Sequence, residues 1–161
     1  NGNPVFGQLG TDRPHQFKAQ FIHALPWDTT IGINQRYASG TPISTEYSVS
    51  PNLPFFPYGR GDRGRTDSIT QTDVMLAKEF ELGGDRSFEV TLNIRNLFDE
   101  DAVTDVDNSG LDQDLPLTNE EFFAGFDPEA VIAANDVARN PSFGIAENFQ
   151  ARREIRVGLR F

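Results

Sequence analysis

The residues whose spacing most clearly points to chemistry lie in one acidic stretch, DVDNSGLDQD, which begins at Asp105. Asp105, Asp107 and Ser109 occupy positions 1, 3 and 5 of a calcium-binding loop, and Gly110 stands where such a loop turns sharply. The carbonyl of Leu111 falls at position 7, which supplies a backbone oxygen in such loops. We therefore predict a Ca²⁺ site formed by Asp105, Asp107, Ser109 and Leu111.

The calcium pattern is incomplete at its last position, where Pro116 replaces the bidentate glutamate. Asp112 or Asp114 would have to take that role. The alternative is a solvated acidic loop, in which closely spaced aspartates are common. Both interpretations stay open at this stage.

Residue types suited to catalysis are scarce, and we expect no enzyme. The chain has no cysteine and two histidines, His15 and His23, which fall on one predicted strand without a Ser-His-Asp pattern or a metal-binding spacing. Glu120 and Glu121 are adjacent and therefore point apart on a helix.

An RGD tripeptide at 60–62 would suit an adhesion protein, but a loop rich in Gly and Arg explains it more simply.

The charge of the chain is concentrated in one segment. Residues 99–149 hold 13 of the 24 acidic residues and one of the 14 basic residues, Arg139. Nucleic-acid binding depends on Lys and Arg that neutralise phosphates, so this polyanionic segment argues against a nucleic-acid partner. It is compatible with cations or with plain solvation.

Five stretches of the chain alternate apolar and polar residues, the pattern of strands with one apolar face. They are residues 14–25, 29–40, 69–82, 87–98 and 153–161. Two connections between them are tight turns, Pro26 to Asp28 and Gly83 to Arg86. The other two are long and lack alternation, at about residues 40–68 and 99–149.

This unequal pattern of connections predicts a particular all-β fold. If neighbouring strands pair antiparallel, both short turns fall at one end of the sheet and both long loops at the other. Strands of about ten residues with that asymmetry are typical of an outer-membrane β-barrel. We predict an antiparallel meander of five long strands, part of a transmembrane β-barrel.

Residues 117–136 break the alternation, and their capping patterns predict two short helices in the long acidic loop.

Several stretches resemble the C-terminal end of a TonB-dependent outer-membrane receptor, closest to the Oar-like branch whose members often begin with a carboxypeptidase-regulatory-like domain. They occur in the expected order: DRPHQFKAQFIHALPW, QRYASGTPIS, GRGDRGRTDSITQTDVMLAKEF, VTLNIRNLFD and NPSFG with RREIRVGLRF. The resemblance covers nearly the whole chain, although the acidic loop matches less well. It implies that residues 1–161 are a single segment, the last five strands of a larger barrel of about 22 strands.

The resemblance also implies partners. Such barrels usually end in a strand with alternating apolar residues and a terminal aromatic, which the barrel-assembly machinery reads. By resemblance that signal is formed by Ile155, Val157, Leu159 and Phe161. The other implied partners are outer-membrane lipid, TonB through an N-terminal part that this sequence does not contain, and a surface lipoprotein.

The function expected from these observations is energy-coupled uptake of a scarce ligand across the bacterial outer membrane. Its transported ligand stays unknown, and no cofactor is expected apart from Ca²⁺ in the acidic loop. Polar groups on the inner face would line the path: Lys18, Arg36, Asp73, Glu79, Glu89, Arg95, Arg156 and Arg160. The alternative is a soluble, calcium-dependent β-sandwich module that binds a glycan or a protein.

Overall fold

The computed structural model describes residues 7–49, 53–84 and 86–161. The chain divides into two compact units. The strand unit consists of Arg13–Ser39, Asp67–Ala102 and Phe149–Phe161, and the loop unit consists of the described residues of Asn1–Asp12, Gly40–Thr66 and Val103–Asn148. No helix among the described residues has the length and apolar character needed to cross a membrane.

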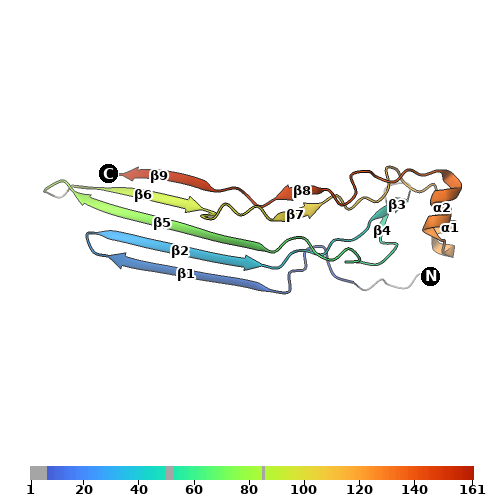
Figure 1. Cartoon of the computed structure of the whole chain (residues 1–161), viewed down its shortest axis with the longest axis horizontal. Helices are drawn as coiled ribbons and strands as arrows, with labels where there is room; N and C mark the ends of the chain where they lie inside the picture. The colour runs from blue at the N-terminus through green and yellow to red at the C-terminus, as the bar shows by residue number, and fades with distance from the viewer. Residues whose placement is uncertain (1–6, 50–52, 85) are drawn as a thin grey trace. The chain divides into compact units, whose positions relative to one another are not determined.

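The strand unit is one antiparallel five-stranded sheet (Figure 1). Its order is β1-β2-β5-β6-β9, so each strand pairs with its nearest long neighbour in sequence. The strands are β1 (Gln16–Leu25), β2 (Thr29–Ala38), β5 (Ile69–Glu81), β6 (Ser87–Arg95) and β9 (Glu154–Arg160). The predicted antiparallel meander of five long strands is confirmed, and the fold is all-β with short helices.

Both tight turns lie at the same end of this sheet. Trp27 (φ 62°) and Asp28 (φ 51°) take left-handed conformations between β1 and β2. At the second turn Gly83 and Gly84 also have positive φ, which glycine adopts without steric penalty. Asp85, in the middle of the predicted GGDR turn, lies outside the described residues. The two long connections therefore leave from the opposite end of the sheet.

The long connections contain more regular structure than the two short helices that the sequence predicts. They fold together into the loop unit, which contains two small antiparallel sheets and two helices (Figure 1). The bounds are β3 (Tyr47–Val49), β4 (Leu53–Phe55), β7 (Val103–Val106), β8 (Ala146–Phe149), α1 (Asn119–Ala124) and α2 (Pro128–Asn135). Strands of three or four residues are too short to show a period in sequence, which explains why they were missed.

The two helices confirm the capping patterns read from the sequence. Thr118 caps α1 in a capping box: its side chain accepts from the Glu121 backbone N–H, and the Glu121 carboxylate accepts from the Thr118 N–H. Asp127 caps α2, and Pro128 stands in its first turn. These local bonds satisfy backbone groups that a helix terminus would otherwise leave without partners.

The core of the loop unit joins residues far apart in sequence. Its buried members are Tyr47, Val49, Leu111, Leu115, Ile132 and Val137. Phe55, Leu117, Phe122, Phe126 and Val131 pack against them. Phe123, next to Phe122 on the same helix, is 68% exposed. The amphipathic face of a six-residue helix is narrow, so only one of its two adjacent phenylalanines reaches the core.

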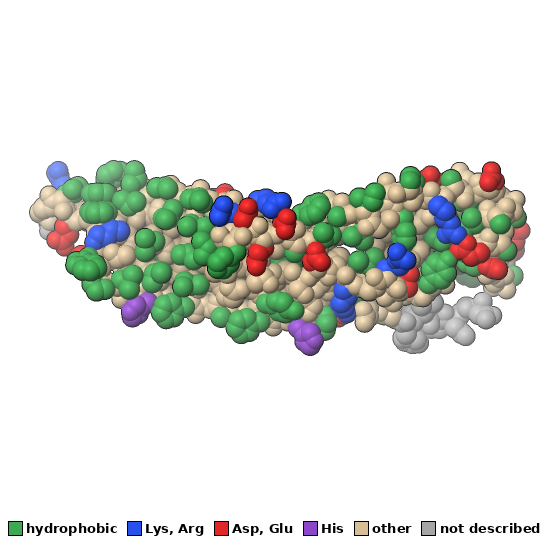
Figure 2. Space-filling view, viewed as in Figure 1, with side chains coloured by type: hydrophobic (Ala, Val, Ile, Leu, Met, Phe, Trp, Pro, Cys, Tyr) green, Lys and Arg blue, Asp and Glu red, His purple; other side chains and the backbone are tan. Residues whose placement is uncertain are grey.

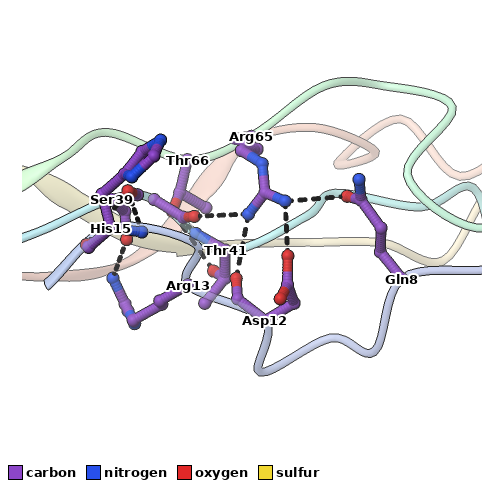
Figure 3. A network of polar contacts seen from close by, with 9 residues as sticks. Gln8, Asp12, Arg13, His15, Ser39, Thr41, Arg65 and Thr66 are labelled. Atoms are coloured by element: carbon purple, nitrogen blue, oxygen red, sulfur yellow. Dashed lines mark hydrogen bonds and ion pairs between the residues drawn. The ribbon is translucent and has the colours of Figure 1, made fainter.

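Arg65 ties separate segments of the loop unit together (Figure 3). Its guanidinium donates to the carbonyls of Asp12 and Gly40, each at 2.9 Å, and pairs with the Asp12 carboxylate at 2.6 Å. Within the strand unit, Ser39 forms a different junction. Its hydroxyl accepts from the His15 N–H and donates to the His15 carbonyl, which fastens the entry of β1 to the end of β2.

Candidate functional site

One face of the five-stranded sheet is apolar across every strand. The register aligns three rows: Phe21, Ile33, Val74, Ile94 and Ile155; His23, Ile31, Leu76, Leu92 and Val157; and Leu25, Thr29, Lys78, Val90 and Leu159. Twelve of these fifteen positions hold apolar side chains, and the other three are His23, Thr29 and Lys78. The period-2 alternation predicted from the sequence therefore places the apolar side chains on one continuous surface.

This apolar face is uncovered in the strand unit. Phe21 is 55% exposed, Val157 70% and Leu159 65%. Figure 2 shows hydrophobic side chains spread over the strands on the visible face. An exposed apolar surface that crosses five strands marks contact with a partner or with lipid.

Aromatic rings border the apolar face at the end with the tight turns. The ring centroids of Phe80 and Phe88 are 4.9 Å apart, and those of Phe88 and Phe161 are 6.2 Å apart. Trp27, in the other turn, is 82% exposed. Aromatic side chains gather in this way where a membrane-spanning sheet meets the lipid–water interface.

The opposite face of the sheet is polar and carries charges of both signs. All eight groups predicted for the inner face share it: Lys18, Arg36, Asp73, Glu79, Glu89, Arg95, Arg156 and Arg160. Glu154 joins two of them, pairing with Arg95 at 3.5 Å and with Arg156 at 2.6 Å. A face of this kind requires water or polar partners.

A cleft of about 610 Å³ opens in the loop unit. Its wall includes Thr45, Tyr47, Tyr58, Arg63, Arg139 and Phe143. Tyr58 and Tyr47 meet edge to face, with ring centroids 6.2 Å apart. The volume lies within the range of small-molecule sites, about 300–1,000 Å³.

A polar network joins helix α2 to one side of this cleft. The Tyr58 hydroxyl donates to the Glu129 carboxylate at 2.5 Å, and Arg139 donates to both Glu129 and the Tyr47 hydroxyl. The hydrogen bond from Tyr58 lowers the pKa of Glu129 below its ordinary value of 4.5. The stabilisation from Glu129 is therefore present above about pH 4.5 and is lost as the pH falls through the lowered folded value.

The same hydrogen bond raises the pKa of Tyr58, because it favours the neutral phenol. We expect Tyr58 to keep its proton above about pH 10, the ordinary pKa of this side chain. Glu129→Gln should bring its titration back toward that value. Alkaline titration of the phenolate absorbance measures the change, and an identical curve for both proteins would contradict the network.

The backbone of Gly110 lies very close to the Tyr47 ring in the wall of this cleft. A Cβ atom at this position would lie 2.4 Å from Cε1 of Tyr47, whose side chain is buried. We expect Gly110→Ala to displace the Tyr47 ring and to destabilise the loop unit by about 1–3 kcal/mol, the usual effect of overpacking. Chemical denaturation followed by tyrosine fluorescence measures this, with Gly10→Ala as the control because a Cβ there meets nothing within 4 Å.

The predicted calcium ligands take part in hydrogen bonds within the loop unit. The Asp107 carboxylate accepts from the Ser109 N–H at 2.9 Å and from the Asn140 amide at 2.8 Å. The Leu111 carbonyl accepts from the Ser109 hydroxyl, and Asp105 accepts from the Val106 N–H. Among the described residues, no three His, Cys, Asp or Glu side chains gather as a metal site. The calcium site stays a prediction, and calorimetry with Ca²⁺ on the intact protein tests it.

The RGD tripeptide is held within the loop unit by its aspartate. Both oxygens of Asp62 accept hydrogen bonds from Thr45, one from the backbone N–H at 2.7 Å and one from the hydroxyl at 2.6 Å. Gly61 donates its N–H to the Ser44 hydroxyl at 2.8 Å. These contacts give the tripeptide a local structural role, in agreement with the simpler interpretation of the sequence.

The cleft residues were not identified from the sequence as a site. Tyr47 and Arg139 are 92 positions apart, and Tyr58 and Glu129 are 71 apart, so no local pattern joins them. The one available signal was Arg139, the single basic residue of the acidic segment 99–149. An isolated opposite charge marks an ion pair or a site, but it does not identify the partner.

An antiparallel sheet with one uncovered apolar face and one charged face is expected where strands separate an apolar partner or medium from water. Comparison with known proteins agrees: the TonB-dependent transporter Oar of Myxococcus xanthus is 27% identical over 174 aligned positions. The alignment covers 96% of this chain and 16% of Oar. No family model matches the chain, and no solved structure is similar to it. The relative is a transporter and not an enzyme, and the similarity supports a relationship with TonB-dependent receptors.

Proposed function

We propose that this chain forms the C-terminal strands of an outer-membrane TonB-dependent receptor that imports a scarce ligand. The observation that carries the proposal is the uncovered apolar face, continuous across all five strands and bordered by aromatic rings. Lipid covers such a face in a barrel, while the charged face lines a wet interior. The similarity to Oar along nearly the whole chain supports the same conclusion.

The strand unit requires further strands to complete this function. Five strands are fewer than the roughly eight of the smallest outer-membrane barrels. β1 and β9 are the two edges of the sheet, and each presents unpaired backbone groups on its outer side. In the proposed receptor, strands of the remaining barrel pair with both edges, and TonB acts through the N-terminal part.

The loop unit belongs, in this proposal, to the extracellular side. Both long connections leave the sheet at the end opposite the tight turns, and outer-membrane barrels have short turns on the periplasmic side. The connections would therefore meet the ligand, or a surface lipoprotein, before it enters the barrel. The charged inner face of the strands would then line its path.

We propose that β9 carries the signal for barrel assembly. Ile155, Val157 and Leu159 share the apolar face, and the terminal Phe161 is 92% exposed beside Phe88. We expect Phe161→Ala to reduce the amount of receptor assembled in the outer membrane severalfold, measured by heat-modifiable migration on gels. Arg160→Ala, on the polar face, is the control and should assemble normally. Equal assembly of both variants and wild type would argue against a signal at Phe161.

The experiment that tests the function is fractionation of cells of the source organism, blotted with an antibody to the acidic loop. We expect a band several times heavier than 17.9 kDa in the outer-membrane fraction. A soluble band near 17.9 kDa would contradict the proposal. It would instead favour the calcium-dependent β-sandwich, which has less support because no second sheet covers the apolar face among the described residues.

A further inference from the structure

We propose that the cleft of the loop unit binds a ligand with a single carboxylate attached to a flat, aromatic or unsaturated body. The inference rests on the proposed function in one respect, that the long connections are the part of the receptor that meets the ligand. Three features of the cleft point to this ligand. They are two guanidinium groups, three aromatic rings, and carboxylates whose oxygens already accept hydrogen bonds from neighbouring residues.

Arg63 supplies the free positive charge of the cleft. Its guanidinium carbon lies 5.3 Å from the centroid of the Phe143 ring, and among the described residues no carboxylate pairs with it. A guanidinium presents several N–H donors in a planar fork, and that fork matches the two oxygens of a carboxylate. Stacking on an aromatic ring leaves the edge of the guanidinium free to make such a contact.

The acceptors near the cleft are already occupied. Both Asp62 oxygens accept hydrogen bonds from Thr45. Glu129 accepts from Tyr58 and is paired with Arg139. The wall therefore offers a ligand more donors than acceptors, and it favours an acceptor-rich group over a cationic or donor-rich one.

Aromatic rings provide the apolar part of the cleft. Tyr47, Tyr58 and Phe143 all line it, and Tyr58 is 55% exposed. Rings of this kind pack against flat ligand groups by stacking or edge-to-face contact. A cleft of about 610 Å³ has room for a small flat molecule with further substituents.

The surrounding charge limits the ligand to a low negative charge. Segment 99–149 carries 13 acidic residues and one basic residue, Arg139, which lies in the cleft. A polyanion would be repelled by this segment, whereas a single carboxylate is matched by Arg63. Charge therefore favours a monocarboxylate over phosphorylated or polycarboxylate ligands.

The test is binding of 4-fluorobenzoate to the native protein in detergent, followed by fluorine NMR. This probe carries only the carboxylate and the flat ring, so we expect a dissociation constant of about 1 mM. Arg63→Gln should weaken binding about tenfold, which corresponds to the loss of about 1.4 kcal/mol. The neutral analogue 4-fluorobenzamide should bind wild type at least about tenfold more weakly.

Arg60→Gln is the matched control, because Arg60 also stacks on an aromatic ring, Phe56, but does not line the cleft. It should bind 4-fluorobenzoate as wild type does. Resistance of the loop unit to trypsin shows that each variant is folded. The proposal is overturned if folded wild type does not bind the probe, if Arg63→Gln binds it equally well, or if Arg60→Gln loses binding to the same extent. Because binding does not depend on membrane location, a negative result here leaves the fractionation result unaffected.

Discussion

Leu92→Arg is expected to prevent stable insertion of the sheet into a bilayer. Leu92 lies in the middle of the apolar face, between Leu76 on β5 and Val157 on β9. In the proposed barrel its side chain faces the hydrocarbon core, where an arginine costs about 2–4 kcal/mol near the midplane. Most of the variant should therefore fail to reach the folded, membrane-inserted state.

The measurement is the yield of folded receptor in the outer membrane, together with urea unfolding in lipid vesicles. Thr91→Arg is the matched control on the same strand. Thr91 belongs to the polar face and lies between Ala77, whose side chain is a single methyl group, and Gly158, which has no side chain. We expect this variant to insert nearly as well as wild type. If Leu92→Arg inserts equally well, the apolar face does not contact lipid.

Leu115→Ala is expected to unfold the loop unit while the strand unit stays intact. Leu115 is fully buried at 0% exposure, and its N–H donates to the Ser48 carbonyl at 2.8 Å. Truncation removes buried methyl groups from the centre of the core and leaves a cavity, which costs about 2–5 kcal/mol. A unit built from short strands and short helices has little stability in reserve against such a loss.

Limited proteolysis and near-ultraviolet circular dichroism measure this effect, since Tyr47 and Tyr58 lie in the loop unit. Leu53→Ala is the control, because Leu53 is 45% exposed and its truncation removes little buried surface. We expect the loop unit of Leu115→Ala to be cut much faster than that of Leu53→Ala. Equal rates of cleavage would show that Leu115 does not hold the two long connections together.

The elements with regular patterns could be predicted from the sequence because local geometry determines them. Side chains alternate along a strand, so the apolar positions of residues 87–98 predicted both the strand and its faces. Thr118 and Glu121 are three residues apart, which is the distance that a capping box requires. The assembly signal and the calcium ligands are also sequence patterns, and they stay predictions that the experiments above test.

Local sequence patterns are enough to predict the five strands, their antiparallel order, their two faces and the caps of the two helices. The shared core of the long connections, and the cleft lined by Arg63, Arg139 and three aromatic rings, are seen only in the folded protein. The difference lies in the range of the interactions. Strand alternation and helix caps depend on residues a few positions apart, whereas the contact between Tyr47 and Arg139 joins positions separated by 92 residues and forms only when the chain packs.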